Sequence, residues 1–197
     1  ASNDLDEHII ESLKHQGATI AVWGVGTRLV TGNDQPALGG VYKLSALRDH
    51  EGTWQPKLKL SEQVAKTSVP GILQVRRFAD ERGMVADMIF DETSGIDPRH
   101  MIVDIKDATR RKQIPPHTTG SNLVVPVMRQ GRVVRSTESL DEIRQRVNTQ
   151  LTTLHPTIRR FLNPHEYPVG LDVGLHELRE QMIYAARHAN ETYKHVP

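Results

Sequence analysis

Residues 21–30 read AVWGVGTRLV, in which an apolar run leads directly into Gly24-Val25-Gly26-Thr27. Glycines at alternate positions let the backbone turn sharply and bring its N–H groups close to an anion, and the Thr27 hydroxyl adds a further donor. A short helix that begins at Thr27 would present its unpaired N–H groups at the same place. The pattern predicts a phosphate-binding turn, and a plain turn at the end of a strand is the alternative interpretation.

The residues before this turn have the order of an α/β unit. Asp4 and Glu7 are predicted to form a capping box for a helix that Gly17 ends. Residues 19–23 are apolar on both faces, as in a parallel strand covered by helices. A parallel strand needs neighbours, and no other helix–strand repeat follows in the sequence. We therefore expect residues 1–38 to be the last helix–strand part of an α/β barrel or sheet whose other strands lie outside this chain.

The polar residues at the start of the chain have a predicted place beside the glycine turn. In parallel α/β folds, ligands bind at the carboxyl ends of the strands. Ser2 and Asn3 would lie at the end of the missing strand, next to the turn that begins at Gly24. Together they would form a cradle for a ribose phosphate. The predicted phosphate-binding residues are Ser2, Asn3, Gly24, Val25, Gly26 and Thr27.

Residues 39–136 have a different character and are predicted to form an antiparallel β-rich domain. Asp80-Glu81-Arg82-Gly83 and Gln130-Gly131 are typical of hairpin turns between strand-length runs. Residues 91–122 are the least regular part, because prolines and Gly120 interrupt them. The strands are expected at residues 41–44, 57–60, 72–78, 84–90, 100–105, 123–128 and 132–135.

Residues 137–197 are predicted to be a helical tail that packs on the β domain. Ser139 with Glu142 can cap a helix whose apolar residues follow at spacings of three and four. Pro156 interrupts this helix, residues 163–170 form an irregular connector, and a second amphipathic helix follows from about 175 to 193. The fold class is therefore α/β, or α+β when the whole chain is considered.

Composition excludes several classes of function. The formal charge is +1, so no overall field draws the protein to nucleic acid or to anionic lipid, and the basic residues 110–112 are predicted to be solvated. The chain lacks cysteine, which fits a reducing compartment, and no apolar run approaches the roughly 20 residues of a membrane helix. The histidines lack metal-ligand spacing, so no metal site is expected. We expect a cytoplasmic protein and, since there is no initiator methionine, a piece of a longer chain.

A series of motifs follows one another along most of the chain. They are SNDLDE at 2–7, WGVGT with LVT at 23–31, PALGGVYKL at 36–44, KLS at 59–61, KT with PG at 66–71, and LNP with YPV at 162–169. Together they closely resemble the carboxyl-terminal half of nicotinate phosphoribosyltransferases. Residues 91–122 depart from the resemblance and are interpreted as a divergent insertion.

The resemblance implies a fold and a reaction. The fold is an incomplete α/β barrel beside a β-rich domain that both ends of a longer polypeptide build. In the reaction, nicotinate displaces pyrophosphate from phosphoribosyl pyrophosphate and gives nicotinate mononucleotide; ATP hydrolysis assists through a phosphorylated histidine, and Mg²⁺ binds mainly to the pyrophosphate. On this likeness residues 24–27 hold the 5′-phosphate, and Ser2 and Asn3 face the ribose and phosphate.

The resemblance also limits what this chain can do alone. In the family, the phosphorylated histidine and the arginine that grips the nicotinate carboxylate lie upstream of the matched region. No catalytic residue is therefore expected here, the amino-terminal half is an expected partner, and the family suggests a homodimer. The alternative function is a non-catalytic nucleotide-phosphate-binding or scaffolding module. A third hypothesis is a nucleic-acid contact through Arg110-Arg111-Lys112.

Overall fold

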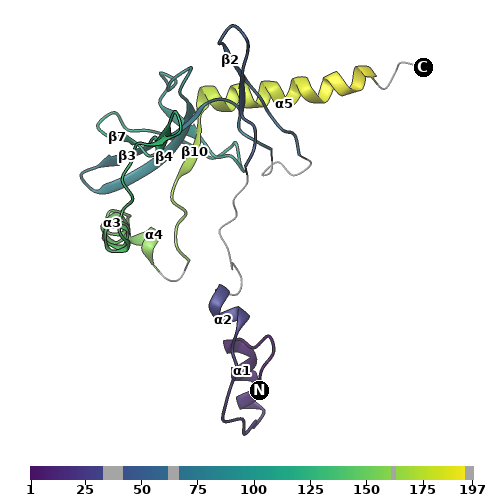
Figure 1. The fold of residues 1–197 in the computed structure, drawn as a ribbon, viewed down its shortest axis with the longest axis vertical. Helices are drawn as coiled ribbons and strands as arrows, with labels where there is room; N and C mark the ends of the chain where they lie inside the picture. Colours follow the sequence, from purple (N-terminus) through teal and green to yellow (C-terminus); the bar gives the residue numbers. More distant parts are fainter. Residues whose placement is uncertain (33–41, 62–66, 161–162, 194–197) are drawn as a thin grey trace. The chain divides into compact units, whose positions relative to one another are not determined.

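The computed structural model describes residues 1–32, 42–61, 67–160 and 163–193 (Figure 1). The chain divides into two compact units, Ala1–Tyr42 and Lys43–Pro197, which are described separately. The predicted boundary after residue 38 lies outside the described residues. That boundary and the second one after residue 136 stay predictions.

Unit 1 contains two helices, α1 (Glu7–His15) and α2 (Thr27–Thr31). The predicted strand at residues 19–23 has no regular ladder, and only an isolated parallel bridge joins Ser2 to Gly24. The N-cap of α1 is Asp6, whose side chain accepts the Ile9 N–H at 2.8 Å. The prediction of Asp4 as the cap was wrong, because Asp4 has a left-handed φ of +46° instead of the extended backbone of an N-cap.

Unit 2 is built on a six-stranded sheet with the strand order β6-β5-β10-β4-β3-β7 (Figure 1). Two small antiparallel ribbons, β1–β2 and β8–β9, accompany it. The strands of the sheet are β3 (Leu73–Asp80), β4 (Gly83–Asp91), β5 (Met101–Val103), β6 (Arg111–Gln113), β7 (Thr119–Asn122) and β10 (Val169–Asp172). The ribbons comprise β1 (Ala46–Arg48), β2 (Trp54–Pro56), β8 (Met128–Arg129) and β9 (Arg132–Val133).

Both predicted hairpins are confirmed. β3 and β4 pair antiparallel through a tight turn, and β8 and β9 pair across Gln130 and Gly131, which both have positive φ as type I′ turns require. Gly83, with φ +118°, is required for a second reason. A Cβ on Gly83 would lie 2.1 Å from the Thr153 carbonyl oxygen, which accepts the Met84 N–H at 2.9 Å.

The central strand β10 corrects two predictions. β10 pairs parallel with β4 and antiparallel with β5, so residues 169–172 are a sheet strand and neither an irregular connector nor part of a purely helical tail. The approach to β5 is close, since a Cβ on Gly170 would lie 2.6 Å from the Val103 carbonyl oxygen. Residues 91–122, interpreted as an insertion, supply β5, β6 and β7 to the same sheet.

Three of the predicted strands are not regular strands over most of their described residues. Residues 57–60 alternate between polar and apolar, yet they are not a strand. Residue 41 lies outside the described residues, and residues 42–44 have no regular structure. Residues 123–127 also form no strand, because the Gln74 side chain takes the place of a strand ladder: it accepts the Val124 N–H at 3.0 Å and donates to the Val124 carbonyl at 3.1 Å.

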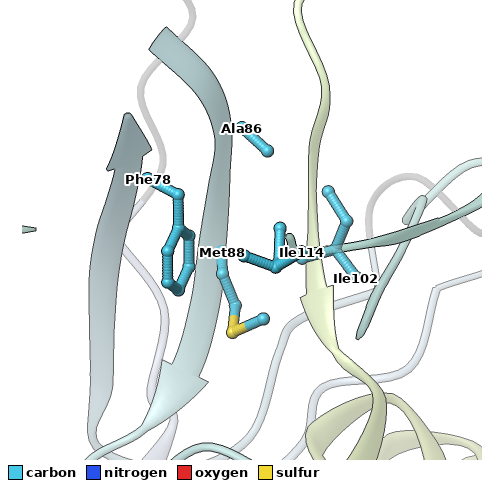
Figure 2. Close-up of a cluster of buried hydrophobic side chains, with 5 residues drawn as sticks. All are labelled: Phe78, Ala86, Met88, Ile102 and Ile114. Carbon is cyan, nitrogen blue, oxygen red and sulfur yellow. The ribbon is translucent and has the colours of Figure 1, made fainter. Parts of the chain in front are cut away.

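The hydrophobic core of unit 2 gathers side chains from one face of the sheet. Figure 2 shows these side chains converging between the strands. Met88 and Ala86 of β4 are fully buried and stand at the centre of the cluster. The cluster comprises Phe78, Ala86, Met88, Ile102 and Ile114.

Three helices follow the chain order that the sequence predicts. α3 (Leu140–Thr152) begins with the predicted capping box of Ser139 and Glu142, and α4 (Pro156–Arg159) begins at Pro156. α5 (Val173–Tyr193) starts directly after β10, and its Arg179 is buried against the Ser68 and Thr67 carbonyls at 3.3 and 3.4 Å. The two helices predicted after Ser139 and from about residue 175 are thus present as α3 and α5.

Candidate functional site

The structure brings the two predicted strand ends of unit 1 into contact. The parallel bridge joins Ser2 to Gly24, and the Gly24 N–H donates to the Ala1 carbonyl at 2.7 Å. A Cβ on Gly24 would lie only 3.1 Å from the Ser2 Cβ, so a glycine at this position lets the two segments approach. The predicted neighbours Ser2 and Gly24 therefore lie side by side.

The turn that follows Gly24 presents unpaired backbone donors. Within the described part of the chain, the N–H groups of Val25, Gly26 and Thr27 donate to no acceptor. Gly26 is the N-cap of α2 and has no side-chain cap, while its carbonyl accepts the first helical hydrogen bonds from Leu29 and Val30 at 3.1 Å. No atom lies within 4 Å of a Cβ built on Gly26. The space beside Gly26, on the side where a Cβ would stand, is therefore open to residues other than its chain neighbours.

Asn3 and Asp4 form the turn from the first strand end into α1. Both have positive φ, +89° and +46°, which is uncommon for residues other than glycine. Such backbone conformations cost free energy and cluster at functional sites. Asn3 and Thr27 are both exposed, and Asn3 directly follows the residue that bridges to Gly24.

An ion pair between Asp6 and Arg28 adds two residues that the sequence did not indicate. The buried Asp6 carboxylate accepts the Ile9 N–H through Oδ1 and binds Arg28 Nη1 through Oδ2. The hydrogen bond from Ile9 lowers the pKa of Asp6, and the Arg28 charge adds to this against the opposing effect of burial. A cavity of about 410 Å³ lies beside the pair and is also lined by Val25. A separation of 22 residues leaves no pattern from which this pair could be predicted.

Unit 2 holds a second polar cluster, on the sheet. The buried Asp87 carboxylate accepts two hydrogen bonds from Arg77, at 2.9 and 2.7 Å, and one from the Tyr167 hydroxyl at 2.9 Å. Burial, followed by the hydrogen bond to Asp87, raises the pKa of Tyr167. All three groups satisfy one another, so this cluster ties the segment before β10 to the sheet.

The basic residues 110–112 have partners within the protein. Arg110 binds Glu166 at 2.9 Å, and Lys112 donates to the Val85 carbonyl at 3.1 Å. Across residues 1–32, 42–61, 67–160 and 163–193, no group of three His, Asp or Glu side chains could hold a metal ion. The helices of that part of the chain include none that is long and apolar enough to cross a bilayer.

Comparisons with known proteins match one family. Residues 73–179 match the family model described as the nicotinate phosphoribosyltransferase C-terminal domain. The nicotinate phosphoribosyltransferase of Bacillus subtilis is 32% identical over 95% of this chain, and that of Caenorhabditis elegans is 33% identical over 90%. The chain spans only 39% and 31% of the length of these relatives.

A solved structure has the same fold. The crystal structure of human nicotinic acid phosphoribosyltransferase matches 92% of this chain, and 32% of its own length, with a TM-score of 0.56 and 24% sequence identity. Residues 91–122 lie within the range that the family model matches. With a domain match over more than half of its length and relatives that match 90–95% of it, this chain belongs to the nicotinate phosphoribosyltransferase family and carries its C-terminal domain.

Proposed function

We propose that this chain is the carboxyl-terminal part of an enzyme that forms nicotinate mononucleotide and pyrophosphate from nicotinate and phosphoribosyl pyrophosphate, with hydrolysis of ATP. Its own contribution is the site for the nucleotide phosphate, made by Ser2, Asn3 and residues 24–27. The observation that supports this assignment is the parallel bridge between Ser2 and Gly24. The bridge makes Ser2 and Gly24 neighbours, which supports a ligand site like those at the carboxyl ends of adjacent strands in parallel α/β folds.

In this proposal the site acts by positioning and by neutralising charge. The N–H groups of Val25, Gly26 and Thr27 and the Thr27 hydroxyl donate to the phosphate oxygens, and Ser2 and Asn3 face the ribose. A phosphate held in this way fixes the sugar carbon at which nicotinate displaces pyrophosphate, so the site lowers the barrier by orienting the reactants. The bonds themselves are made and broken among groups of the upstream half.

ATP and Mg²⁺ belong to the whole enzyme in this proposal. The described residues offer no group of three carboxylates or histidines, so they do not fit a protein-made metal cage. Magnesium commonly binds substrate phosphates and keeps several waters, which fits an ion carried by the pyrophosphate. No residue of this chain is assigned to ATP.

Exposed apolar side chains support a need for the amino-terminal half. Val22, Leu29 and Val30 of unit 1 are 71–84% exposed, and α1 buries no residue. Apolar surface of this extent marks a site that another part of a protein covers. We propose that the amino-terminal half covers it, in a homodimeric enzyme of the cytoplasm; the absence of cysteine fits such a reducing compartment.

The test is an assay for nicotinate mononucleotide with the chain alone and with the amino-terminal half supplied. We expect product only from the combination. Turnover by the isolated chain would show that it contains catalytic groups and would refute this division of labour. No turnover from the combination, together with retained nucleotide binding, would favour the non-catalytic module.

A second test separates the phosphate site from a structural turn. Gly26→Asp adds a carboxylate at the N-cap of α2, where a Cβ has open space, and the added negative charge should abolish binding in a titration with nicotinate mononucleotide. Gln16→Asp is the control, because Gln16 is exposed, has a negative φ and lies at the far end of α1. An unchanged affinity of Gly26→Asp would refute the phosphate site.

A further inference from the structure

We infer that Asp6 and Arg28 clamp residues 24–27 against Ser2 and Asn3, and that both are positioning residues of the phosphate site. The role of the clamp in binding rests on the proposed function; the clamp itself rests on contacts within unit 1. The pair is separate from the predicted phosphate ligands, and Asp6 accepts hydrogen bonds from both the Ile9 N–H and the Arg28 guanidinium.

The clamp follows from the equal spacing of two contacts along two segments. Ser2 pairs with Gly24, and the residues four positions further along each segment, Asp6 and Arg28, pair with each other. Between these contacts lie residues 3–5 on one segment and residues 25–27 on the other. The proposed cradle is therefore closed by a backbone contact at one end and by an ion pair at the other.

The two oxygens of Asp6 have separate structural roles. Oδ1 caps α1 by accepting the Ile9 N–H, and Oδ2 holds Arg28 in the first turn of α2. The Asp6 side chain is only 6% exposed, whereas that of Arg28 is 39% exposed. A buried carboxylate that joins two helix starts fixes their relative position more firmly than an ion pair on the surface does. The start of α2 is where the turn at residues 24–27 ends.

Two roles of Arg28, positioning the turn and binding the phosphate directly, predict opposite changes in anion affinity when the Asp6 charge is removed. If Asp6 only neutralised an arginine that binds phosphate, removal of the Asp6 charge would release Arg28 and strengthen anion binding. If the pair positions the turn, the same change weakens binding. Asp6→Asn is suited to this comparison, because the amide oxygen can still accept the Ile9 N–H and cap α1.

The experiment uses the full 197-residue chain, with nicotinate mononucleotide and inorganic phosphate as probes. Affinity is measured by calorimetry, and the Gly24 and Gly26 amide signals are followed by NMR. We expect Asp6→Asn and Arg28→Gln each to weaken nucleotide binding about tenfold, since small displacements of positioning groups have effects of this size or larger. The double variant should bind no worse than Asp6→Asn, and Arg28→Lys should recover part of the affinity.

Glu7→Gln is the matched control, because Glu7 is an adjacent acid whose ion pair is with the exposed His8. Nucleotide binding by Asp6→Asn as tight as in the parent, or tighter, would overturn the clamp and leave the phosphate site intact. If the parent binds no nucleotide, the phosphate site is refuted. The clamp is then overturned as well if the NMR signals of the Gly24 and Gly26 amides have the same positions in Asp6→Asn as in the parent. Should Asp6→Asn fail to fold, Arg28→Gln decides by the same measurements.

Discussion

Replacement of Tyr167 by phenylalanine should destabilise unit 2 through one hydrogen bond. The Tyr167 hydroxyl donates to the buried Asp87 carboxylate at 2.9 Å, across 80 residues of chain. Hydrogen bonds to charged groups contribute about 1.5–3 kcal/mol. Asp87 keeps both of its bonds to Arg77 in the variant, so we expect the free energy of unfolding to fall by about 1.5 kcal/mol, the lower end of that range.

The stability difference between the parent and Tyr167→Phe should also depend on pH. Burial and the Asp87 carboxylate raise the pKa of Tyr167 above its usual value of 10.0. Above pH 10 the unfolded chain therefore loses the Tyr167 proton while the folded chain retains it, and the free energy of unfolding falls as the pH rises. Tyr167→Phe lacks this proton. The difference in stability between parent and variant should consequently shrink above pH 10.

Urea unfolding followed by circular dichroism at pH 7 and above pH 10 measures both effects. Tyr184→Phe is the matched control, because the Tyr184 side chain is 65% exposed and its ring stacks on His188. Equal stabilities of the two variants at pH 7 would refute the hydrogen-bond contribution. A difference between Tyr167→Phe and the parent that stays constant above pH 10 would refute the raised pKa.

Three further predictions concern the same unit. Gly83→Ala should lower the free energy of unfolding, measured with a chemical denaturant, by about 2 kcal/mol or more, because Gly83 has a positive φ and its Cβ would meet the Thr153 carbonyl. Gly95→Ala should lower it by less, because Gly95 has a positive φ but open space around it. Burial lowers the pKa of His176 below 6.5, so the unfolded chain takes up a proton more readily than the folded one and the parent should lose stability as the pH falls below 6.5. A difference in free energy of unfolding between the parent and His176→Leu that does not change with pH would contradict this. Burial raises the pKa of Asp172 above 3.8, so the folded chain binds a proton more readily than the unfolded one. The free energy of unfolding of the parent should therefore rise relative to that of Asp172→Asn as the pH falls toward 3.8, and unfolding titrations in which it falls would contradict this.

The features that the sequence predicted correctly depend on nearby residues. The capping box of Ser139 and Glu142 spans one helical turn, and the Gln130-Gly131 turn needs only the backbone freedom of two residues. The start of α2 at Thr27 likewise follows from the glycine before it. The contact between Ser2 and Gly24 was predicted from a general rule about strand ends in α/β folds, and it is present.

The features that were missed depend on residues far apart in the chain. β10 has only four residues, and its pairing with residues 87–89 and 102–103 is not visible in its own composition. β7 is polar and exposed throughout, so it lacks the alternation that predicts strands. The cap at Asp6 in place of Asp4 depends on a left-handed turn, and the Asp6–Arg28 pair depends on the folded position of two helices.

The place of β10 in the sheet has a consequence for the order of folding. β6 and β5 form one group of strands and β4, β3 and β7 another, and β10 is the strand through which these groups join. Both groups are synthesised before residue 169, but the strand that unites them comes afterwards. During translation the two groups can join through β10 only after Asp172 has left the ribosome, and until then each group has an unpaired edge where β10 will bind.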